Sequence, residues 1–380
     1  PSMRRRIILA GGGHAHLAVL ADWARRPLPG TRRWLVTPAR HMAYSGMVPG
    51  WMAGLYRAED LLIDLEPLAR RAGAELVLAE VAGLDPAARR LQLPSGAVLD
   101  FDLLSLATGG ETDCAGLAAL GDRLLPVRPL GRFMARWPSF LDCHAGAAGL
   151  HVAVLGGGAA GVELALGAAA AMRGLRDARV SLVTAREGFL SGHAPKVRAA
   201  ALDALARGAV GVHFARATGA RDGLVLSGGG LLAADLVIAA TGSRAPGWLA
   251  QTGLACSAEG FVAVGADLRS LSHGHVLAAG DIAERVDRKL ERSGVHAVKA
   301  GPVLAANLRA ALAGGPLRPY RPRSRTLYLL ALGGRRAILS WGGLAAVGGW
   351  VWRIKDRIDR GFVRRYTDQQ IALSRKGEPS

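Results

Sequence analysis

Two glycine-rich turns, each directly after a short apolar run, constrain the fold of this chain most strongly. The first turn, GGGHAH, spans 11–16 and follows the apolar run 7–10; the second, GGGAAGVE, spans 156–163 and follows 151–155. Both lead into a helical pattern and then another apolar run, so each is a βαβ unit of the expected length. One such turn alone is weak evidence, but two in matching contexts predict two dinucleotide-binding domains.

The two units repeat the same order of elements. Strand, helix and second strand are predicted at 7–10, about 15–25 and 34–37, and again at 151–155, about 160–173 and 180–184. Each unit is closed by a matching tail, LLSLATGG at 103–110 and LVIAATGS at 236–243. We therefore predict an α/β fold with two Rossmann-like domains, the second inserted in the first, and a small C-terminal α+β segment. The predicted boundaries are 3–119 with 265–316, then 120–264, then 317–380.

The glycines have separate roles in a turn of this kind. The first allows the tight bend, the second admits the pyrophosphate, and the third lets the helix pack closely on its strand. The second turn has all three, Gly156, Gly158 and Gly161. In the first turn His16 takes the third place, so we expect its helix to lie slightly farther from its strand.

The acidic residue that usually holds the adenosine ribose is missing after both second strands. Thr37 and Arg40 follow the first of these strands. Thr184 and Arg186 follow the second, with Glu187 one position later. An arginine can meet a 2′-phosphate, so the choice between NADH and NADPH stays open.

Composition excludes several classes of function. The net charge is +18, but the arginines are dispersed without interleaved aromatics, so we expect no nucleic-acid partner. The three cysteines lie far apart, which argues against a disulfide scaffold, a redox dithiol and a zinc site. The histidines show no metal-ligand spacing, so no metal is expected. No apolar stretch approaches the roughly 18 residues that a membrane-spanning helix needs.

The motifs GGG, both ATG tails, GGGAAGVELA and AAGD occur in an order that resembles the pyridine nucleotide–disulfide oxidoreductase superfamily. The chain is most similar to its type II NADH dehydrogenase branch. It is closer still to a flavoprotein subgroup that is sometimes fused to selenide, water dikinase, through GGGHAH, YSGMVPG, HAPKVR and RPYRP…WRIKDRIDRGF. The resemblance covers nearly the whole chain, and it implies FAD on the first turn and NADH or NADPH on the second.

The resemblance also implies which residues hold FAD. They are Gly11, Gly12, Gly13, His14, Ala15, Thr37, Arg40, Ser45, Gly46, Val81, Ala107, Thr108, Gly109, Gly280, Asp281 and Ala300. Val81 would touch the adenine through its backbone, and Asp281 would accept hydrogen bonds from the ribityl hydroxyls. For Asp281, capping of a following helix is the alternative.

The nicotinamide nucleotide would be held by a matching set in the second unit. These residues are Gly156, Gly157, Gly158, Ala159, Ala160, Gly161, Thr184, Arg186, Thr241 and Gly242.

Two further residues are candidates for the redox step. Glu163 would lie where nicotinamide meets flavin and would position the substrate or handle a proton, unless it only caps the helix start. A helix opening at Gly301 with Pro302 in its first turn would point its positive end at the flavin, and Lys299 would add a charge. The alternative for Lys299 is a solvated surface side chain.

Three departures from known relatives leave the electron acceptor open. Type II NADH dehydrogenases carry a glutamine-rich stretch before the flavin-facing helix, whereas 294–301 contains no glutamine. Disulfide reductases need a cysteine pair in the first module, and sulfide:quinone oxidoreductases need cysteines flanking the flavin, one of them late in the chain. Nothing after Cys256 qualifies.

The C-terminal segment offers a clue to the acceptor. A helix from Trp350 would place Trp350, Val351, Ile354, Ile358 and Phe362 on one arc and arginines on another. Such a basic amphipathic helix suits an anionic membrane surface, although the same arc could pack on the protein itself.

The resemblance implies an FAD-dependent NAD(P)H dehydrogenase in which hydride passes from nicotinamide to FAD and electrons then pass to a quinone-like acceptor. A small soluble selenium- or sulfur-type acceptor and a flavin-based redox sensor with little turnover are the alternatives. We expect a cytoplasmic protein. A peripheral position on the inner membrane face and a homodimer are left open.

Overall fold

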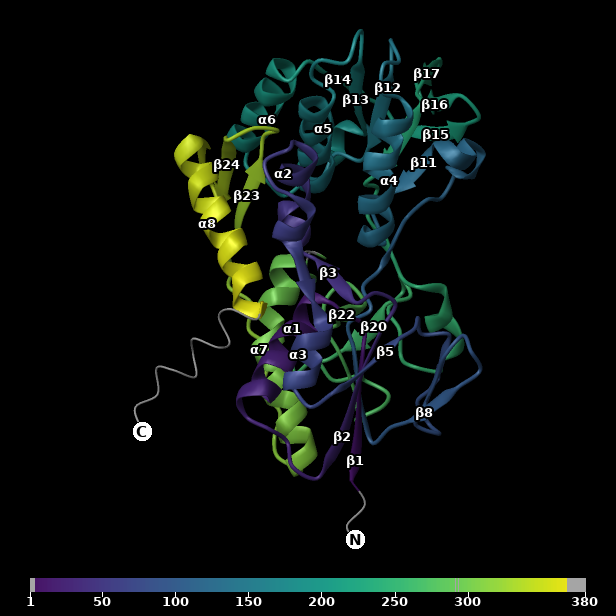
Figure 1. The fold of residues 1–380 in the computed structure, drawn as a ribbon, viewed down its shortest axis with the longest axis vertical. Helices are drawn as coiled ribbons and strands as arrows, with labels where there is room; N and C mark the ends of the chain where they lie inside the picture. The colour runs from purple at the N-terminus through teal and green to yellow at the C-terminus, as the bar shows by residue number, and fades with distance from the viewer. Residues whose placement is uncertain (1–3, 291, 293, 368–380) are drawn as a thin grey trace.

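The computed structural model describes residues 4–290, 292 and 294–367. It contains two α/β units, one below the other in Figure 1, with the C-terminal segment along one side of both. The first unit has a five-stranded parallel sheet of order β21-β9-β1-β2-β5. Its strands are β1 (Arg5–Ala10), β2 (Thr31–Thr37), β5 (Glu75–Leu78), β9 (Leu103–Leu106) and β21 (Val276–Ala278). Its helices are α1 (His14–Arg25), α3 (Leu65–Arg71) and α7 (Gly294–Ala313).

The second unit repeats this plan. Its parallel sheet has the order β11-β18-β12-β13-β14, so the strand before the turn again lies between the tail strand and the second strand. These strands are β11 (Leu124–Pro126), β12 (His151–Leu155), β13 (Arg179–Thr184), β14 (Val210–Phe214) and β18 (Leu236–Ala239). The helices are α4 (Leu130–Cys143), α5 (Ala159–Ala171) and α6 (Pro195–Arg207). The predicted fold of two Rossmann-like domains is confirmed.

Smaller elements decorate the two sheets. The first unit carries β3 (His41–Ala43), β4 (Leu62–Asp64), α2 (Val48–Met52), β6 (Gly83–Asp85), β7 (Arg90–Gln92), β8 (Val98–Asp100), β20 (Val262–Val264) and β22 (Ala283–Arg285). The second carries β15 (Ala217–Ala220), β16 (Gly223–Leu226) and β17 (Leu231–Ala233). The short strands β10 (Glu111–Thr112) and β19 (Ser243–Arg244) pair antiparallel where the chain crosses between the units.

The strands at the centre of each sheet are apolar because both of their faces are covered. In β1, Ile7, Ile8 and Leu9 are fully buried, and β12 is buried along its whole length. This continuous burial is typical of parallel sheets with helices on both sides.

The chain returns to the first unit earlier than residue 265. Leu249, Leu254 and Val262 are buried in one cluster with Ile8 and Val36 of the first sheet. The polypeptide has therefore left the second unit at about residue 245, after its last sheet strand, β18. The other predicted boundaries are not tested by these contacts and stay a prediction.

Helix α7 begins at Gly294, so the predicted start at Gly301 is wrong. Pro302 lies inside the helix, where its ring faces solvent. Gly301 has a packing role instead, because a Cβ there would lie 2.7 Å from the Cβ of Ala18 on α1. The glycine therefore allows α1 and α7 to cross closely, side by side at the heart of the first unit (Figure 1).

The C-terminal segment forms a cap of one antiparallel sheet and one helix. It comprises β23 (Leu327–Ala331), β24 (Ala337–Trp341), β25 (Leu344–Gly348) and α8 (Gly349–Tyr366). Figure 1 shows α8 running from beside the second unit down to the first. The cap packs directly on α5, since a Cβ on Gly333 would lie 2.4 Å from the carbonyl oxygen of Leu166.

Candidate functional site

The first glycine turn fits tightly against the end of β9. Gly11 has φ +97°, and a Cβ there would lie 2.3 Å from the carbonyl oxygen of Ala107. A Cβ on Gly13 would meet the same oxygen at 2.5 Å, and one on Gly12 would lie 3.1 Å from Oγ1 of Thr37. Only glycine fits this turn, which leaves its outer side free for a ligand's phosphates to approach the backbone.

The second turn makes the matching contacts. Gly156 has φ +125°, and its Cβ would lie 2.2 Å from the carbonyl oxygen of Ala240. A Cβ on Gly157 would meet Oγ1 of Thr184 at 2.2 Å. The two turns therefore use equivalent residues in both units, as the repeated sequence pattern predicts.

The third position of the motif differs between the turns. In the second turn a Cβ on Gly161 would lie 1.8 Å from the carbonyl oxygen of Gly156, so the helix backbone itself reaches that oxygen. In the first turn His16 is fully buried, and its Nδ1 lies 2.6 Å from the carbonyl oxygen of Gly11. An imidazole therefore fills the space that close helix packing removes in the second unit.

Two shielded polar atoms beside the first turn lack a hydrogen-bond partner within the described chain. They are Nε2 of His14 and Oγ1 of Thr108. Burial lowers the pKa of His14 to about 4, so its imidazole is neutral near pH 7. Unpartnered polar atoms next to a glycine cradle at a helix N-terminus fit a dinucleotide such as FAD.

Asp281 already has a partner. Its Oδ2 lies 2.7 Å from a guanidinium nitrogen of Arg128, and its side chain is only 15% exposed. Arg128 follows β11, and its backbone N–H donates to Oγ1 of Thr112 at 2.8 Å. The carboxylate expected at the ribityl chain is therefore joined to an arginine at the crossing between the units, which the sequence did not indicate.

A buried polar cluster joins α8 to the first unit. Nζ of Lys355 donates to the carbonyl oxygen of Gly46 at 2.7 Å and lies 2.6 Å from Oδ2 of Asp359. The hydroxyl of Tyr44 donates to Oδ1 of the same carboxylate at 3.2 Å. Lys355 and Asp359 are both buried, so this ion pair lies in a region of low dielectric.

Aromatic rings close the same region from the other side. Tyr44 and Phe362 stack with ring centroids 4.4 Å apart, and the ring of His14 lies 5.7 and 5.9 Å from them. A Cβ on Gly294, at the start of α7, would lie 3.8 Å from the His14 ring. The N-termini of α1 and α7 therefore meet the cap beside the first turn.

Glu163 on α5 faces the cap and does not cap its own helix. Its Oε1 accepts the backbone N–H of Ala331 on β23 at 2.7 Å, so the capping alternative is wrong. Burial raises the pKa of Glu163 to about 7, although the charge of Lys355 and the Ala331 hydrogen bond oppose the rise. Near neutral pH this carboxyl therefore exists in both protonation states.

The segment that contains Tyr44 and Gly46 lies between the units. It continues into α2, and a Cβ on Gly167 of α5 would lie 3.0 Å from the carbonyl oxygen of Pro49. Glu163 is one turn earlier on α5. The first turn, α2, α5 and α8 thus converge on one region.

Two arginines lie where the adenosine of the nicotinamide nucleotide is expected. The guanidinium of Arg186 lies over the ring of Phe214 at 4.3 Å, and Arg216 is 2.9 Å from Oε1 of Glu187. Thr241 donates its hydroxyl hydrogen to the carbonyl oxygen of Asp113. Arginines thus surround the site expected for the ribose.

Three other residues expected to bind or face FAD are Arg40, Val81 and Lys299. Arg40 pairs with Asp64 at 2.7 Å. Val81 is half-buried against the apolar cluster that contains Ile8 and Val36. Lys299 is exposed and lies within α7 rather than at its start, which favours the solvated alternative.

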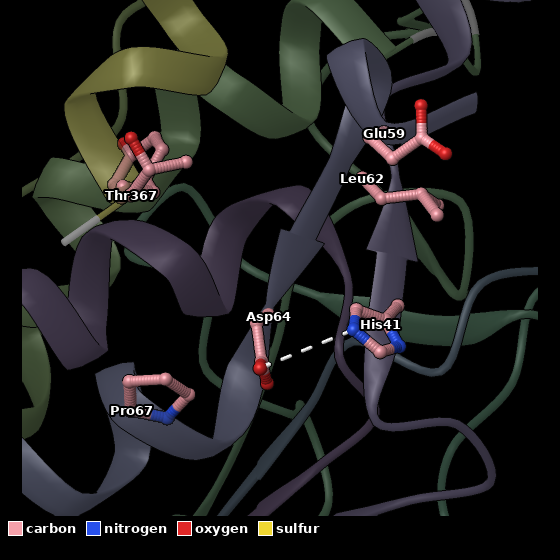
Figure 2. Close-up of a pocket in the computed structure, with 7 residues that line it drawn as sticks. His41, Glu59, Leu62, Asp64, Pro67 and Thr367 are labelled. Atoms are coloured by element: carbon pink, nitrogen blue, oxygen red, sulfur yellow. Dashed lines mark ion pairs between the residues drawn. The ribbon is translucent and has the colours of Figure 1, made fainter. Parts of the chain in front are cut away.

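A pocket of about 230 Å³ lies beside this region, between the β3–β4 hairpin and the end of α8. Figure 2 shows the His41 ring pointing toward Asp64, with Nε2 and Oδ2 3.9 Å apart. The lining residues are His41, Glu59, Leu62, Asp64, Pro67, Tyr366 and Thr367. None of these belongs to either glycine turn, but the pocket adjoins the expected FAD site, because Asp64 pairs with Arg40.

Four polar residues of this region were not predicted from the sequence, namely Tyr44, Arg128, Lys355 and Asp359. The (i, i+4) spacing of Lys355 and Asp359 was a usable signal, as was the rarity of lysine in an arginine-rich chain. Their partners, however, lie some 300 residues away in sequence, so their burial could not be read locally.

Comparison with known families agrees with this geometry. Residues 5–301 match the family model described as pyridine nucleotide-disulphide oxidoreductase. The chain belongs to this family. As a member it is an FAD-dependent oxidoreductase that uses a nicotinamide nucleotide, which confirms the cofactors predicted from the two turns.

Individual members of the family are distant from this chain in sequence. The sulfide-quinone reductase of Aquifex aeolicus (strain VF5) is 24% identical over 107 residues, which are 28% of this chain and 25% of that protein. The match therefore spans a quarter of that relative's length.

Solved structures show the same fold over nearly the whole chain. The sulfide:quinone oxidoreductase of Aquifex aeolicus has a TM-score of 0.79 at 16% identity, covering 95% of this chain and 91% of that one. NDH2 from Plasmodium falciparum, in complex with NADH, has a TM-score of 0.81 at 13% identity, covering 99% of both. A ferredoxin reductase from Rhodopseudomonas palustris has a TM-score of 0.71 at 24% identity, covering 88% of this chain and 81% of that one.

Proposed function

We propose that this chain is an NAD(P)H dehydrogenase that delivers electrons through FAD to a quinone-like acceptor at a membrane surface. Helix α8 carries the proposal. Its inner face contacts Tyr44 and Gly46 beside the first turn, while its outer face exposes Trp350, Ile354 and Ile358. One helix thus links the cofactor region with an apolar surface from which a lipid-soluble acceptor can arrive.

The outer face of α8 has the composition of a membrane-surface helix. Arg353 and Arg357 are exposed between the apolar residues, and Trp350 is 50% exposed at one end. Basic and apolar side chains on one face, with tryptophan at the edge, favour anionic lipid. This arrangement corrects the predicted arc, because Val351 and Phe362 are buried while Ile354 and Ile358 face outward.

A surface position is also compatible with the rest of the molecule. Among the described residues, no helix is both long and apolar enough to cross a bilayer. The contact with lipid that we propose is therefore a contact along the surface, through α8.

The residues between the units would prepare the redox reaction. FAD, when bound on the first turn, supplies the relay that accepts a hydride and releases electrons one or two at a time. Glu163, with a pKa near 7, would hold or release a proton on its carboxyl group. Lys355 would hold the Gly46 carbonyl in place, and Asp359 would hold Lys355.

The proteins of similar structure support a nicotinamide nucleotide as the electron donor and a quinone as the acceptor. NDH2 from Plasmodium falciparum was solved with NADH, and the Aquifex aeolicus protein is a sulfide:quinone oxidoreductase. Cysteine chemistry is not supported, because the segment 44–50 contains no cysteine. Cys143 and Cys256 are exposed elsewhere, and Cys114 packs against the apolar cluster of the second sheet.

An anaerobic absorption titration tests the reaction. The purified protein carrying FAD is titrated with NADH and with NADPH, and a ubiquinone analogue is then added. We expect the flavin bands to bleach with at least one nucleotide and to recover promptly with the quinone. Bleaching without recovery would reject the quinone and favour a soluble acceptor or a redox sensor, and no bleaching would reject the dehydrogenase.

Vesicle flotation tests whether the exposed face of α8 binds a membrane surface. Replacement of Trp350, Ile354 and Ile358 by serine should reduce binding to anionic vesicles at least tenfold. Leu78→Ser is the matched control, because Leu78 is 60% exposed on the first unit, away from α8. Equal loss in the control and the triple variant, or no loss in either, would contradict membrane docking through α8.

A further inference from the structure

His16 occupies a position that the dinucleotide motif reserves for glycine. It is the sixth residue of GGGHAH and corresponds to Gly161 in GGGAAG of the second unit. A side chain at this place would be expected to force α1 away from β1 and to loosen the turn. The turn is nevertheless fixed, because the imidazole fills the space and both ring nitrogens are bonded. The greater distance of α1 from β1 stays a prediction.

The hydrogen bonds define the protonation state of the ring. The carbonyl oxygen of Gly11 can only accept, so Nδ1 of His16, 2.6 Å away, must carry the hydrogen and donate it. In a neutral imidazole Nε2 then accepts from the hydroxyl of Ser105, at 2.8 Å. Burial lowers the pKa of His16 to about 4, so the ring is neutral over the physiological range, and the bond to Gly11 selects the tautomer.

The two bonds join two separate parts of the first unit. Gly11 is the first residue of the turn, and Ser105 lies on β9, which ends one residue before the Ala107–Gly109 tail. Both His16 and Ser105 are fully buried. The imidazole therefore ties the turn to the strand whose end packs so closely against it that a Cβ on Gly11 would lie 2.3 Å from the carbonyl oxygen of Ala107.

A fixed Gly11 carbonyl has a consequence for the ligand side of the turn. The peptide group is planar and trans, so the carbonyl of Gly11 and the N–H of Gly12 point in opposite directions. When His16 holds the carbonyl inward, the N–H of Gly12 is directed outward, where a phosphate oxygen would accept it. In the second turn the backbone of Gly161, packed on the Gly156 carbonyl, achieves the same by contact alone.

We propose that His16 is a positioning residue for FAD, a neutral imidazole that orients the first peptide group of the pyrophosphate-binding turn through its bond to Gly11. The inference rests on FAD occupying the first turn, as the proposed function requires. It predicts that the bond to Gly11, rather than the volume of the side chain, determines how tightly FAD is held.

Two substitutions of His16 distinguish the effect of its hydrogen bond to Gly11 from the effect of its side-chain volume. In His16→Asn the amide nitrogen can take the place of Nδ1 and still donate to Gly11, although the side chain is smaller. In His16→Gln the volume is closer to that of histidine, but the amide lies where Nε2 was and reaches only Ser105. We expect the FAD dissociation constant to stay within about threefold of wild type for H16N and to rise at least tenfold for H16Q, the loss expected for one buried hydrogen bond.

The matched control is the histidine–serine pair of the second unit. Nε2 of His151 lies 2.9 Å from Oγ of Ser181, and both residues are buried in the second sheet, away from the first turn. In H151N the amide takes the place of Nδ1 and the bond from Nε2 to Ser181 is lost. This variant should lower the melting temperature by an amount similar to that of H16Q but leave the FAD dissociation constant unchanged. General destabilisation is thereby separated from loss of positioning.

The measurement is reconstitution of the full-length apoprotein with FAD, followed by quenching of flavin fluorescence. A wild-type protein that takes up no FAD would overturn the proposed function itself. Wild-type binding with H16Q tighter than H16N, or with the control as weak as H16Q, would overturn the role of His16 alone. Ser105→Ala keeps the bond to Gly11, so tenfold weaker binding in that variant would also contradict the proposal.

Discussion

The two dinucleotide-binding units have the same topology but are completed differently. In the second unit the motif is intact, and Gly161 brings the backbone of α5 onto the Gly156 carbonyl. In the first unit the buried His16 reaches the equivalent carbonyl of Gly11 through a hydrogen bond. One motif can thus be satisfied by close packing or by a side chain, and only the surroundings of the turn decide which.

The cap is also attached to the two units by different kinds of contact. It is joined to the first unit by a buried charged pair, Lys355 and Asp359, which also contacts Tyr44 and Gly46. It is joined to the second by hydrogen bonds that include the one from the Ala331 N–H to Glu163 and one between Nδ1 of His193 and Oγ of Ser340. The first contact contains compensated charges, and the second contains a single carboxyl that can lose its charge, so the two should respond differently to mutation and to pH.

Breaking the charged contact should have the largest effect. Lys355→Met leaves the buried Asp359 carboxylate without its cation, which typically costs about 3–5 kcal/mol. We expect the midpoint of denaturant unfolding to fall accordingly, while K355M combined with D359L recovers most of the loss. Arg357→Met, at an exposed position on the same helix, is the control and should change little. A K355M protein as stable as wild type would contradict the buried pair.

A substitution in the intact glycine motif of the second unit should have the next largest effect. In Gly161→Ala the new methyl group would lie 1.8 Å from the Gly156 carbonyl oxygen, so α5 must shift, at a cost of about 1–3 kcal/mol. Because the shift distorts the second turn, KM for NADH or NADPH should rise about tenfold or more. Flavin content, which depends on the first unit, should stay unchanged. Loss of flavin from this variant would break the distinction between the two turns.

The contact between the cap and the second unit should be sensitive to pH. The pKa of Glu163 is raised to about 7 in the folded protein, from 4.5 when it is exposed, so the folded state holds its proton more tightly. The stability that follows is fully present below about pH 4.5 and is lost as the pH rises toward 7, by a few kcal/mol at most.

Glu163→Gln should remove this pH dependence, since the glutamine cannot ionise but can still accept the Ala331 N–H. Thermal unfolding between pH 4.5 and 8 measures it. Glu59→Gln provides the control, because Glu59 is exposed. An identical slope in wild type and E163Q would show that Glu163 does not titrate in this window.

Much of this architecture could be read from the sequence because it depends on local patterns. Apolar runs before glycine turns, with their ATG tails, predict both sheets, and α1 and α5 begin within one residue of the positions expected from the turns. Gly301 and Pro302 misled the prediction for α7, since the pattern of a helix start there reflects packing against Ala18 and solvent exposure.

The candidate site was only partly predictable for a physical reason. The glycines lie at fixed offsets within the turns, and Thr37 and Thr184 end the second strand of each βαβ unit, so their places follow from the motif. The orientation of α8 does not follow from its own sequence. Its polar Lys355 and Asp359 face inward because Gly46 and Tyr44, from the other end of the chain, supply partners for them.

The adenosine ends of the two units give the smallest expected effect. Arg186 lies over Phe214 at the end of β14, and Arg216 neutralises Glu187. We therefore predict that this site binds the 2′-phosphate of NADPH. Arg186→Glu should shift the ratio of kcat/KM for NADPH over NADH about tenfold toward NADH, equivalent to about 1.4 kcal/mol. Arg40→Glu, at the corresponding place in the first unit, should leave the ratio unchanged, because Arg40 pairs with Asp64 beside the other cofactor. Steady-state rates with both nucleotides decide the question. A shift in the Arg40 variant, or none in the Arg186 variant, would mean that the units are not assigned to their nucleotides as we propose.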